Sequence, residues 1–279
     1  MDRLPPAQGT LGRRNDLCVR LARGRQEITT AQKLRYRVFY EELKANPDPA
    51  SAQSRMDADR YDEFCDHLIV VRNMAANGRG RYSVDGGEMV GTYRLLRQSV
   101  AERNGGFYSQ GEFDIAPLLA ARLDLKFLEL GRSCVLKQYR TKPVVELLWQ
   151  GIWNYVRQHG LDVMLGCASL DGTDQKVHVS TLNFLARNCA APPGWRVRAL
   201  PERYIEMKSN AESATDSKAA LKALPPLIKG YLRLGCYIGE GAVIDWQFNT
   251  TDVLIILPVS RINPRYFTHF GQPDEAVTY

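Results

Sequence analysis

The chain has 279 residues, of which 44% are hydrophobic and 24% are charged, and its formal net charge is +6. This composition is typical of a soluble globular protein with a substantial core. The longest apolar run, residues 253–259, is too short to span a bilayer, so no membrane-spanning helix is predicted. The positive charge favours an acidic partner: a nucleic acid, an anionic membrane or an acidic protein.

The cysteines are scattered along the chain, and none of them forms a CxxC pair. They are Cys18, Cys65, Cys134, Cys167, Cys189 and Cys236. This spacing predicts neither a zinc site nor a redox motif, so no metal is expected. Several cysteines lie in apolar runs, as reduced buried thiols do, and the N-terminus has no apolar signal segment. We therefore expect a reducing, cytoplasmic compartment.

Residues 1–25 are rich in arginine and contain proline and glycine. This pattern predicts a basic mobile tail. Each basic residue near an anionic membrane contributes about 1 kcal/mol, so peripheral contact with the inner face of the cytoplasmic membrane stays open. After this tail, Thr29 and Thr30 predict the start of a helix over residues 31–44. An acidic stretch at residues 57–66 is interpreted as a solvated loop or as an edge that binds an ammonium group.

The remaining elements alternate between strands and helices. Strands are predicted at residues 67–71, 88–96, 126–136, 162–168, 204–207 and 254–257, and helices at residues 115–123, 143–159, 171–187 and 227–234. Turn signals between the first two strands favour a hairpin. The order indicates a mixed α/β fold and not the strict βαβ alternation of a dinucleotide-binding domain.

The strand at residues 126–136 is mostly apolar but contains Glu129 and Arg132. Charges buried in a sheet cost several kcal/mol unless they are paired or used. The strand therefore holds an internal ion pair or contributes to a catalytic site. In a regular strand these two residues would face opposite sides, so we also predict irregular pairing near Gly131.

Four segments occur in an order that resembles a known family. They are Arg35-Tyr36-Arg37-Val38-Phe39, Asp59-Arg60-Tyr61-Asp62, Gly91-Thr92-Tyr93-Arg94-Leu95-Leu96 and Glu129-Leu130-Gly131-Arg132-Ser133. Together, over residues 28–140, they resemble the acyl-homoserine-lactone autoinducer synthases. Those enzymes have a tryptophan soon after the first segment, which is absent here, and they lack the part of the chain from about residue 218 onward.

A fuller resemblance includes residues 64–67, 166–174 and 245–253 and covers nearly the whole chain beyond the tail. It is to the N-acyltransferases of ornithine-lipid synthesis. This resemblance implies a GNAT-like α/β fold, with a mixed twisted sheet flanked by helices. The implied domain covers residues 26–215, and a C-terminal extension of helices and strands, residues 216–279, packs on it.

The same resemblance implies an activity. A 3-hydroxyacyl chain would pass from the thioester of acyl carrier protein to the α-amine of L-ornithine, giving lyso-ornithine lipid. The donor is acyl-phosphopantetheine on the carrier protein, and no tightly bound cofactor is expected. Two alternatives stay open: an autoinducer synthase, and a non-enzymatic, haemolysin-like membrane-binding protein. No recognition motif supports binding to nucleic acid.

Site residues are expected from the resemblance and from the chemistry of aminolysis. Glu129 is the candidate general base, with Arg132 beside it. Arginine suits the carboxylate of ornithine and aspartate its ammonium group. The expected substrate-binding residues are Arg35, Phe39, Asp59, Asp62, Arg94, Ser133 and Val135. Residues 138–143 contain no glycine to hold a CoA pyrophosphate, so Arg140 and Lys142 are expected to meet the carrier protein instead.

Overall fold

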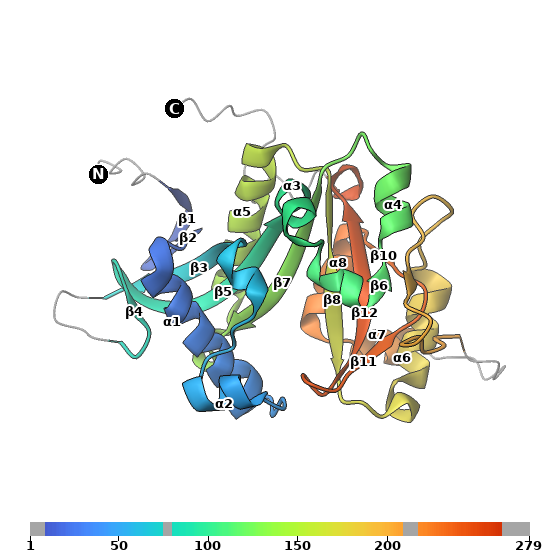
Figure 1. Ribbon diagram of the computed structural model, residues 1–279, viewed down its shortest axis with the longest axis horizontal. Helices are drawn as coiled ribbons and strands as arrows, with labels where there is room; N and C mark the ends of the chain where they lie inside the picture. Colours follow the sequence, from blue (N-terminus) through green and yellow to red (C-terminus); the bar gives the residue numbers. More distant parts are fainter. Residues whose placement is uncertain (1–8, 75–79, 209–216, 264–279) are drawn as a thin grey trace. The chain divides into compact units, whose positions relative to one another are not determined.

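The computed structural model describes residues 9–74, 80–208 and 217–263. The chain divides into two compact units (Figure 1). Unit 1 comprises Met1–Leu96 and Leu130–Gly160, and unit 2 comprises Arg97–Glu129 and Leu161–Tyr279. Strand β7 (Phe127–Val135) therefore contributes its first three residues to unit 2 and the rest to unit 1.

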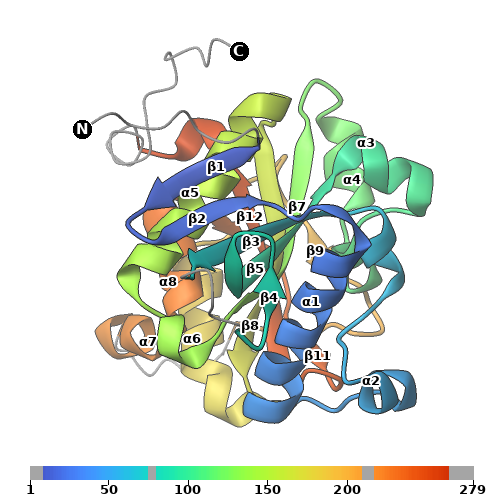
Figure 2. The same ribbon diagram turned by 90° about the vertical axis from the view of Figure 1, so that its left-hand side faces the viewer.

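Unit 1 contains a sheet in which β1, β2, β3, β5 and β7 are successive neighbours (Figure 2). Besides β7, its strands are β1 (Thr10–Arg14), β2 (Leu17–Leu21), β3 (Asp66–Asn73), β4 (Ser83–Val84) and β5 (Gly87–Arg97), with β4 paired to β5. Strands β3 and β5 are antiparallel, which confirms the predicted hairpin.

The first two strands correct the prediction that residues 1–25 form a mobile tail. Strand β2 pairs with β3 along its whole length, and its Val19 is fully buried. The arginine-rich composition of residues 1–25 predicted the tail, but Arg20 donates to both carboxylate oxygens of Glu27 at 2.6 Å. A paired guanidinium can lie within a sheet, so the segment joins the fold. Residues 1–8 lie outside the described part of the chain.

Helices cover both faces of the unit 1 sheet. They are α1 (Gly24–Tyr36), its π-helical continuation (Arg37–Glu42), α2 (Pro49–Ser54), a 3-10 turn (Arg60–Glu63), a second 3-10 turn (Lys137–Tyr139) and α5 (Lys142–His159). Leu34 of α1 packs in one cluster with Ile69 of β3. Gly151 of α5 lies so close to Val19 and Leu68 that a Cβ atom would be 2.6 Å from Val19. Since Leu68 and Ile69 point to opposite faces of β3, the two helices flank the sheet.

Helix α1 begins earlier than predicted, because Arg23 precedes its first turn and Thr29 and Thr30 lie inside it. The Thr30 hydroxyl donates to the carbonyl of Gln26, as a threonine within a helix does, and caps nothing. The helix then continues into the π-helical segment, where the Leu43 N–H donates to the Val38 carbonyl.

Unit 2 contains a sheet with both parallel and antiparallel pairs, as predicted for a mixed sheet. Its strands are the first part of β7, β8 (Val163–Asp171), β10 (Tyr237–Ile238), β11 (Val243–Asp245) and β12 (Thr250–Pro258), and β6 (Phe113–Asp114) pairs with β9 (Arg198–Ala199). Strand β8 runs parallel to β7 at Phe127–Glu129 and antiparallel to β12 along its full length.

The helices of unit 2 are mostly short. They are α3 (Gln98–Ala101), α4 (Ala116–Ala121), α6 (Gln175–Asn188), α7 (Ser217–Ala223) and α8 (Pro226–Leu234), with 3-10 turns at Glu102–Asn104, Tyr108–Gly111 and Val259–Arg261. Among the described residues, no helix is long and apolar enough to cross a membrane.

Two predictions for the C-terminal part differ from the structure. The short strand expected at residues 204–207 is a single bridge between Ile205 and Ala242. The part expected to be an extension supplies β12, which lies between β8 and β10. The apolar side chains of β12 are buried, so this strand forms part of the core of unit 2.

Candidate active site

Six charged side chains form a largely buried network in unit 1, with three arginines and three aspartates. They are Arg35, Asp57, Asp59, Asp62, Arg94 and Arg132. Arg35 lies at the centre and is 1% exposed. Its Nη1 and Nη2 donate to the two oxygens of Asp62 at 2.9 and 2.6 Å, and its Nε lies 2.8 Å from Asp57 Oδ2.

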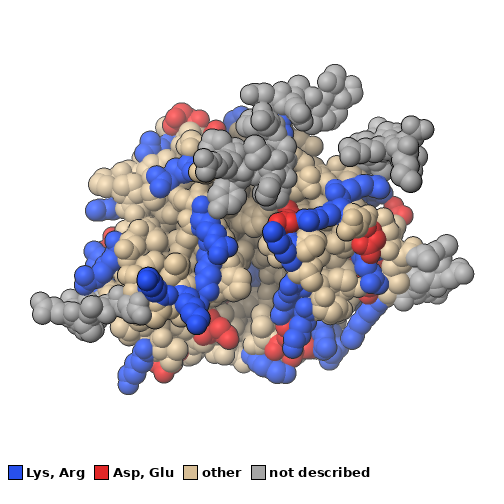
Figure 3. All heavy atoms as spheres, turned by 180° about the vertical axis from the view of Figure 1, so that it is seen from behind, with Lys and Arg blue, Asp and Glu red and all other residues tan. Residues whose placement is uncertain are grey.

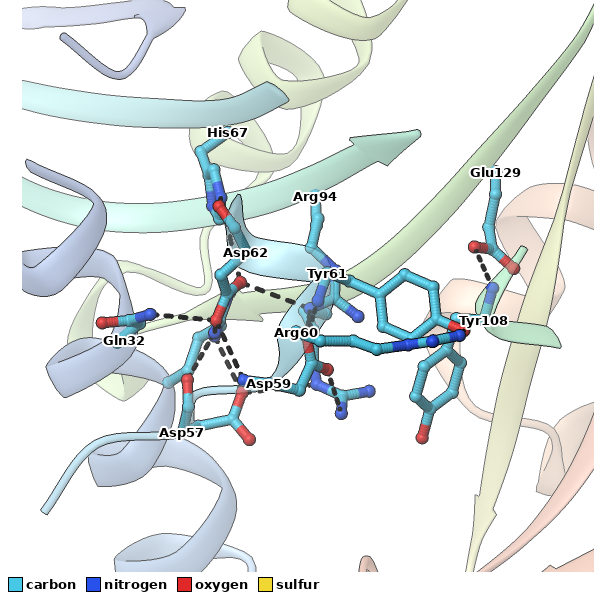
Figure 4. Close-up of polar contacts among 12 residues, drawn as sticks. Gln32, Asp57, Asp59, Arg60, Tyr61, Asp62, His67, Arg94, Tyr108 and Glu129 are labelled. Atoms are coloured by element: carbon cyan, nitrogen blue, oxygen red, sulfur yellow. Dashed lines mark hydrogen bonds and ion pairs between the residues drawn. The ribbon is translucent and has the colours of Figure 1, made fainter. Parts of the chain in front are cut away.

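The other two arginines, Arg94 (Figure 4) and Arg132, extend this network. Arg94 Nη1 lies 2.6 Å from Asp59 Oδ1 and 3.3 Å from Asp62 Oδ1. Arg132 contacts Asp57 at 3.3 Å and Asp59 at 3.2 Å. Because each aspartate contacts two arginines, the buried charges compensate one another, as buried ions require. The side chain of Asp59 is 26% exposed and is the most open of the six.

The segment that supplies the aspartates is held against α1. The N–H of Asp57 donates to the carbonyl of Gln32, and the Tyr40 hydroxyl donates to the Asp57 carboxylate. Asp59 caps the 3-10 turn Arg60–Glu63 by accepting from the N–H of Tyr61. The aspartates of this segment are therefore held both by backbone capping and by their ion pairs with the buried arginines.

The structure gives Asp62 partners inside the protein, where the sequence predicted an ammonium ligand. Besides the arginines, Gln32 Nε2 donates to it at 3.0 Å and the N–H of Asp59 at 3.3 Å. Burial opposes the ionisation of Asp62, but the hydrogen bonds and charge of Arg35, and the charge of Arg94, outweigh it and hold its pKa well below the usual range. Asp62 and Arg35 are both buried, with exposures of 4% and 1%, and their charges are paired within the protein.

Arg132 has a left-handed backbone conformation, with φ of 51°. A non-glycine residue rarely adopts it, and it interrupts the regular alternation of a strand. The sequence predicted irregular pairing near Gly131, and the left-handed residue lies at the next position, Arg132. This conformation helps to direct the Arg132 guanidinium to Asp57 and Asp59.

Glu129 lies in unit 2 at the N-terminal end of the 3-10 turn Tyr108–Gly111 (Figure 4). Its carboxylate accepts from the N–H of Tyr108 at 2.8 Å, the N–H of Ser109 at 2.7 Å and the Ser109 hydroxyl at 2.6 Å. The residue is 4% exposed. Such donors stabilise an ionised carboxylate in a buried position. This explains how the strand accommodates the charge that the sequence singled out.

Unit 2 also contains a buried acidic cluster, here called the Glu112 cluster, made of Glu112, Cys167 and Asp252. The Cys167 thiol donates to Glu112 Oε2 at 3.2 Å, and the ligand atoms of the three residues lie within 4.8 Å of one another. Burial, followed by the negative charge of Asp252, raises the pKa of Glu112 to about 7. Arg203 Nη2 is 3.7 Å from Glu112 Oε1 and partly offsets these effects.

The Glu112 cluster has the spacing of a metal site, but its chemistry fits a metal poorly. Desolvation and the two neighbouring carboxylates raise the pKa of Cys167 well above its ordinary value, so the thiol remains protonated. Metals bind the thiolate. Glu112 follows a polar loop, and nothing in the sequence around it indicates a buried carboxylate. Asp252 and Cys167, polar positions within apolar strands, are the signal that could have indicated the site.

The other predicted residues lie in unit 1. Phe39 is partly buried against the core. Ser133 and Val135 are partly buried on β7. Arg140 donates from Nε to the Val135 carbonyl at 3.0 Å and from Nη1 to Glu42 at 2.5 Å. The side chain of Lys142 is 85% exposed and lies 3.5 Å from Glu146. Of these five, Lys142 is the most open to a partner.

Gly91 begins one of the four segments that resemble the family, and its lack of a side chain is needed for close packing of two strands. A Cβ atom at this position would lie 3.1 Å from the Val135 side chain and 3.3 Å from the Cys134 carbonyl. Only glycine lets β5 approach β7 this closely without displacing atoms.

Comparison with known proteins agrees with this fold. A family model described as an acetyltransferase (GNAT) domain matches residues 34–150. A protein of Agrobacterium fabrum named L-ornithine N(alpha)-acyltransferase is 49% identical over 273 residues, covering 97% of this chain and 90% of that protein. A protein of Brucella abortus with the same name is 50% identical over 261 residues, covering 94% and 91%.

A solved structure, that of FeeM, an N-acyl amino acid synthase from uncultured soil microbes, has a TM-score of 0.49 at 13% identity, covering 91% of this chain and 94% of that one. The two relatives match this chain along nearly all of its length and theirs. The chain therefore belongs to the L-ornithine N(alpha)-acyltransferase family, and it is an N-acyltransferase with a GNAT-like fold.

Proposed function

We propose that the chain transfers a 3-hydroxyacyl group from the thioester of acyl carrier protein to the α-amine of L-ornithine, forming lyso-ornithine lipid. The observation that carries this proposal is the identity of 49–50% to two proteins named for acylation of ornithine, over at least nine-tenths of each chain. The autoinducer-synthase alternative has no comparable support among these relatives.

Aminolysis of a thioester needs a neutral amine, an oriented carbonyl group and donors for the oxyanion. Glu129 is the proposed general base, because its carboxylate is buried on β7 and three hydrogen bonds fix its orientation. The N–H groups of Ser133 and Val135 are proposed to bind the acyl-phosphopantetheine donor. No tightly bound cofactor takes part in this scheme.

Different residues of the charged network in unit 1 are proposed to bind different groups of ornithine. Arg132 is 11% exposed and Arg94 only 4%, so we assign the α-carboxylate of ornithine to Arg132 and a supporting position to Arg94. Asp59 is the proposed partner of the ammonium group at the other end of ornithine. Arg35 and Asp62 position these residues from the core, and Phe39 packs beside them.

The donor side is proposed to meet the acidic surface of acyl carrier protein. Lys142, with Arg140 two residues before it, lies at the start of α5, and lysine and arginine side chains are spread over the face drawn in Figure 3. The carrier protein and the free thiols of all six cysteines suit a cytoplasmic reaction. Peripheral contact with an anionic membrane would allow the lipid product to leave.

The test is incubation of the purified protein with 3-hydroxyacyl carrier protein and either L-ornithine or S-adenosylmethionine, with products identified by mass spectrometry. We expect Nα-acylated ornithine and no lactone. Ornithine blocked at the α-amine should give no product, whereas ornithine blocked at the δ-amine should still react. Acylation of S-adenosylmethionine, or lysis of liposomes without any acyl product, would contradict the proposal.

A further inference from the structure

Arginine and aromatic side chains of unit 2 form a row, here called the arginine–aromatic stack, made of Arg122, Trp195, Tyr237 and Arg261. The guanidinium carbon of Arg122 lies 4.6 Å from the ring centroid of Trp195, and that of Arg261 lies 4.3 Å from the ring centroid of Tyr237. The two ring centroids are 6.0 Å apart. The four residues come from the end of α4, the loop after α6, β10 and the last 3-10 turn, so it is the fold that brings them together.

Hydrogen bonds fix both arginines of the stack. Arg122 Nε donates to the carbonyl of Gly194 at 3.4 Å, and Arg261 Nε donates to the carbonyl of Gly235 at 2.8 Å. Arg261 Nη1 also donates to the Tyr237 hydroxyl at 2.9 Å. Among the described residues, neither guanidinium has a carboxylate as its partner, so both positive charges are oriented by rings and carbonyl groups without being neutralised.

Apolar and basic side chains continue this surface. Leu123 follows the first arginine of the stack and is 87% exposed, more than any other large hydrophobic side chain in the described part of the chain. Arg196 follows the tryptophan and is exposed, as is Arg233 in the last turn of α8. Asp124, on the turn of Leu123, opposes these charges, but the arginines outnumber it. The surface therefore combines net positive charge with an apolar tip.

This combination matches the chemistry of an anionic lipid surface. Tryptophan and tyrosine rings concentrate at the boundary between membrane and water, and arginine binds phosphate groups through paired N–H donors. A leucine gains free energy when it leaves water for an apolar medium. An acidic protein could pair with the arginines, but leucine is under-represented among the residues that dominate protein–protein binding. The exposed Leu123 therefore favours lipid as the partner.

We propose that the arginine–aromatic stack and Leu123 dock unit 2 on an anionic membrane. The arginines contact lipid phosphates, the two rings lie at the level of the head groups, and Leu123 enters the acyl region. This inference gives the peripheral membrane contact of the proposed function a specific surface. It rests on that function only for its use, because the acylated product is a lipid that has to reach a bilayer.

The test is sedimentation of the purified full-length protein with vesicles, either of phosphatidylcholine alone or of phosphatidylcholine mixed with phosphatidylglycerol. We expect binding to the anionic vesicles only, and weaker binding at high salt. Arg122→Gln combined with Arg261→Gln should weaken binding by roughly tenfold or more, since each basic residue at the surface contributes about fivefold. Leu123→Ser, which alters a side chain with few contacts in the protein, should weaken it about tenfold.

The matched control is Lys176→Gln combined with Val177→Ser. Both residues are exposed in the first turn of α6, at the other end of this helix from the loop that carries the tryptophan, and Val177 is 72% exposed. This variant loses one charge and one apolar side chain and should bind vesicles as the parent protein does. Urea denaturation of every variant confirms that the fold is intact.

Three results would overturn the proposal. They are a parent protein that does not sediment with anionic vesicles, Leu123→Ser and arginine variants that bind as the parent does, and arginine variants that keep vesicle binding but raise the KM for acyl carrier protein. The last result would assign the stack to the carrier protein. The vesicle assay contains no substrate, so a failure to make acyl-ornithine would refute the proposed function and leave this measurement intact.

Discussion

Arg35 and Asp62 form a two-pronged ion pair in the interior of unit 1, with N–O distances of 2.9 and 2.6 Å and side chains only 1% and 4% exposed. The arginine comes from α1 and the aspartate from a 3-10 turn 27 residues later. The pair therefore attaches the acidic segment to the helix and holds Asp59 at a position where it is partly exposed.

Asp62→Asn should destabilise the protein because it leaves Arg35 with a buried charge that is no longer balanced. We expect a loss of roughly 3–5 kcal/mol in the free energy of unfolding, measured by urea denaturation at pH 7. Asp85→Asn, in an exposed pair with Arg23, is the control and should cost about 1 kcal/mol or less. If Asp62→Asn is stable and raises only the KM for ornithine, the result would instead support Asp62 as a ligand of the ornithine ammonium group.

The sequence was informative where a charge interrupts an apolar strand. Glu129 and Arg132 were singled out in this way, and both lie in polar surroundings that stabilise their charges. Their partners could not be predicted. Asp59 lies 73 residues before Arg132, and it is the fold that brings them to 3.2 Å. A pattern in one strand indicates that a charge needs a partner, but not which segment supplies it.

Two errors, one near the N-terminus and one at Glu112, have related causes. The arginines, prolines and glycines of residues 1–25 predicted a mobile tail, and the pairing of Arg20 with Glu27 is visible only in three dimensions. Glu112 was missed because a single glutamate after a polar loop is normally exposed. Its burial depends on the packing of β12, whose Asp252 faces it.

Glu129→Gln should lower kcat by roughly 10²–10⁴-fold, because an amide cannot accept the proton of the amine. The substitution also turns an NH₂ group toward the donors of Tyr108 and Ser109, so unfolding must be measured in parallel. Glu102→Gln, at an exposed hydrogen bond to Gln98, is the control. If a folded Glu129→Gln protein turns over at nearly the rate of the parent protein, Glu129 is not the general base.

Lys142→Glu should weaken the interaction with acyl carrier protein by reversing an exposed charge at the start of α5. We expect the KM for the acyl donor to rise about tenfold at low salt, equivalent to about 1.4 kcal/mol, and the KM for ornithine to stay constant. The difference should shrink as salt screens the charges. Lys176→Glu, exposed on α6 of unit 2, is the control, and equal effects of both substitutions would argue against a local docking site.

Glu112 should make the stability of the protein depend on pH in a window that can be calculated. Its pKa rises from 4.5 to about 7 on folding, so between these values the folded protein binds more protons than the unfolded one. The stabilisation is complete below about pH 4.5 and is lost as the pH rises through 7.

Glu112→Gln removes this dependence, because its amide does not titrate. From pH 5 to pH 8 the free energy of unfolding of the parent protein should therefore fall relative to the variant, by about 3 kcal/mol if the whole shift is expressed. Urea denaturation across this range measures the difference, with Glu202→Gln on an exposed turn as the control. Parallel stability curves for the parent protein and Glu112→Gln would mean that Glu112 ionises as an ordinary carboxyl group in the folded protein.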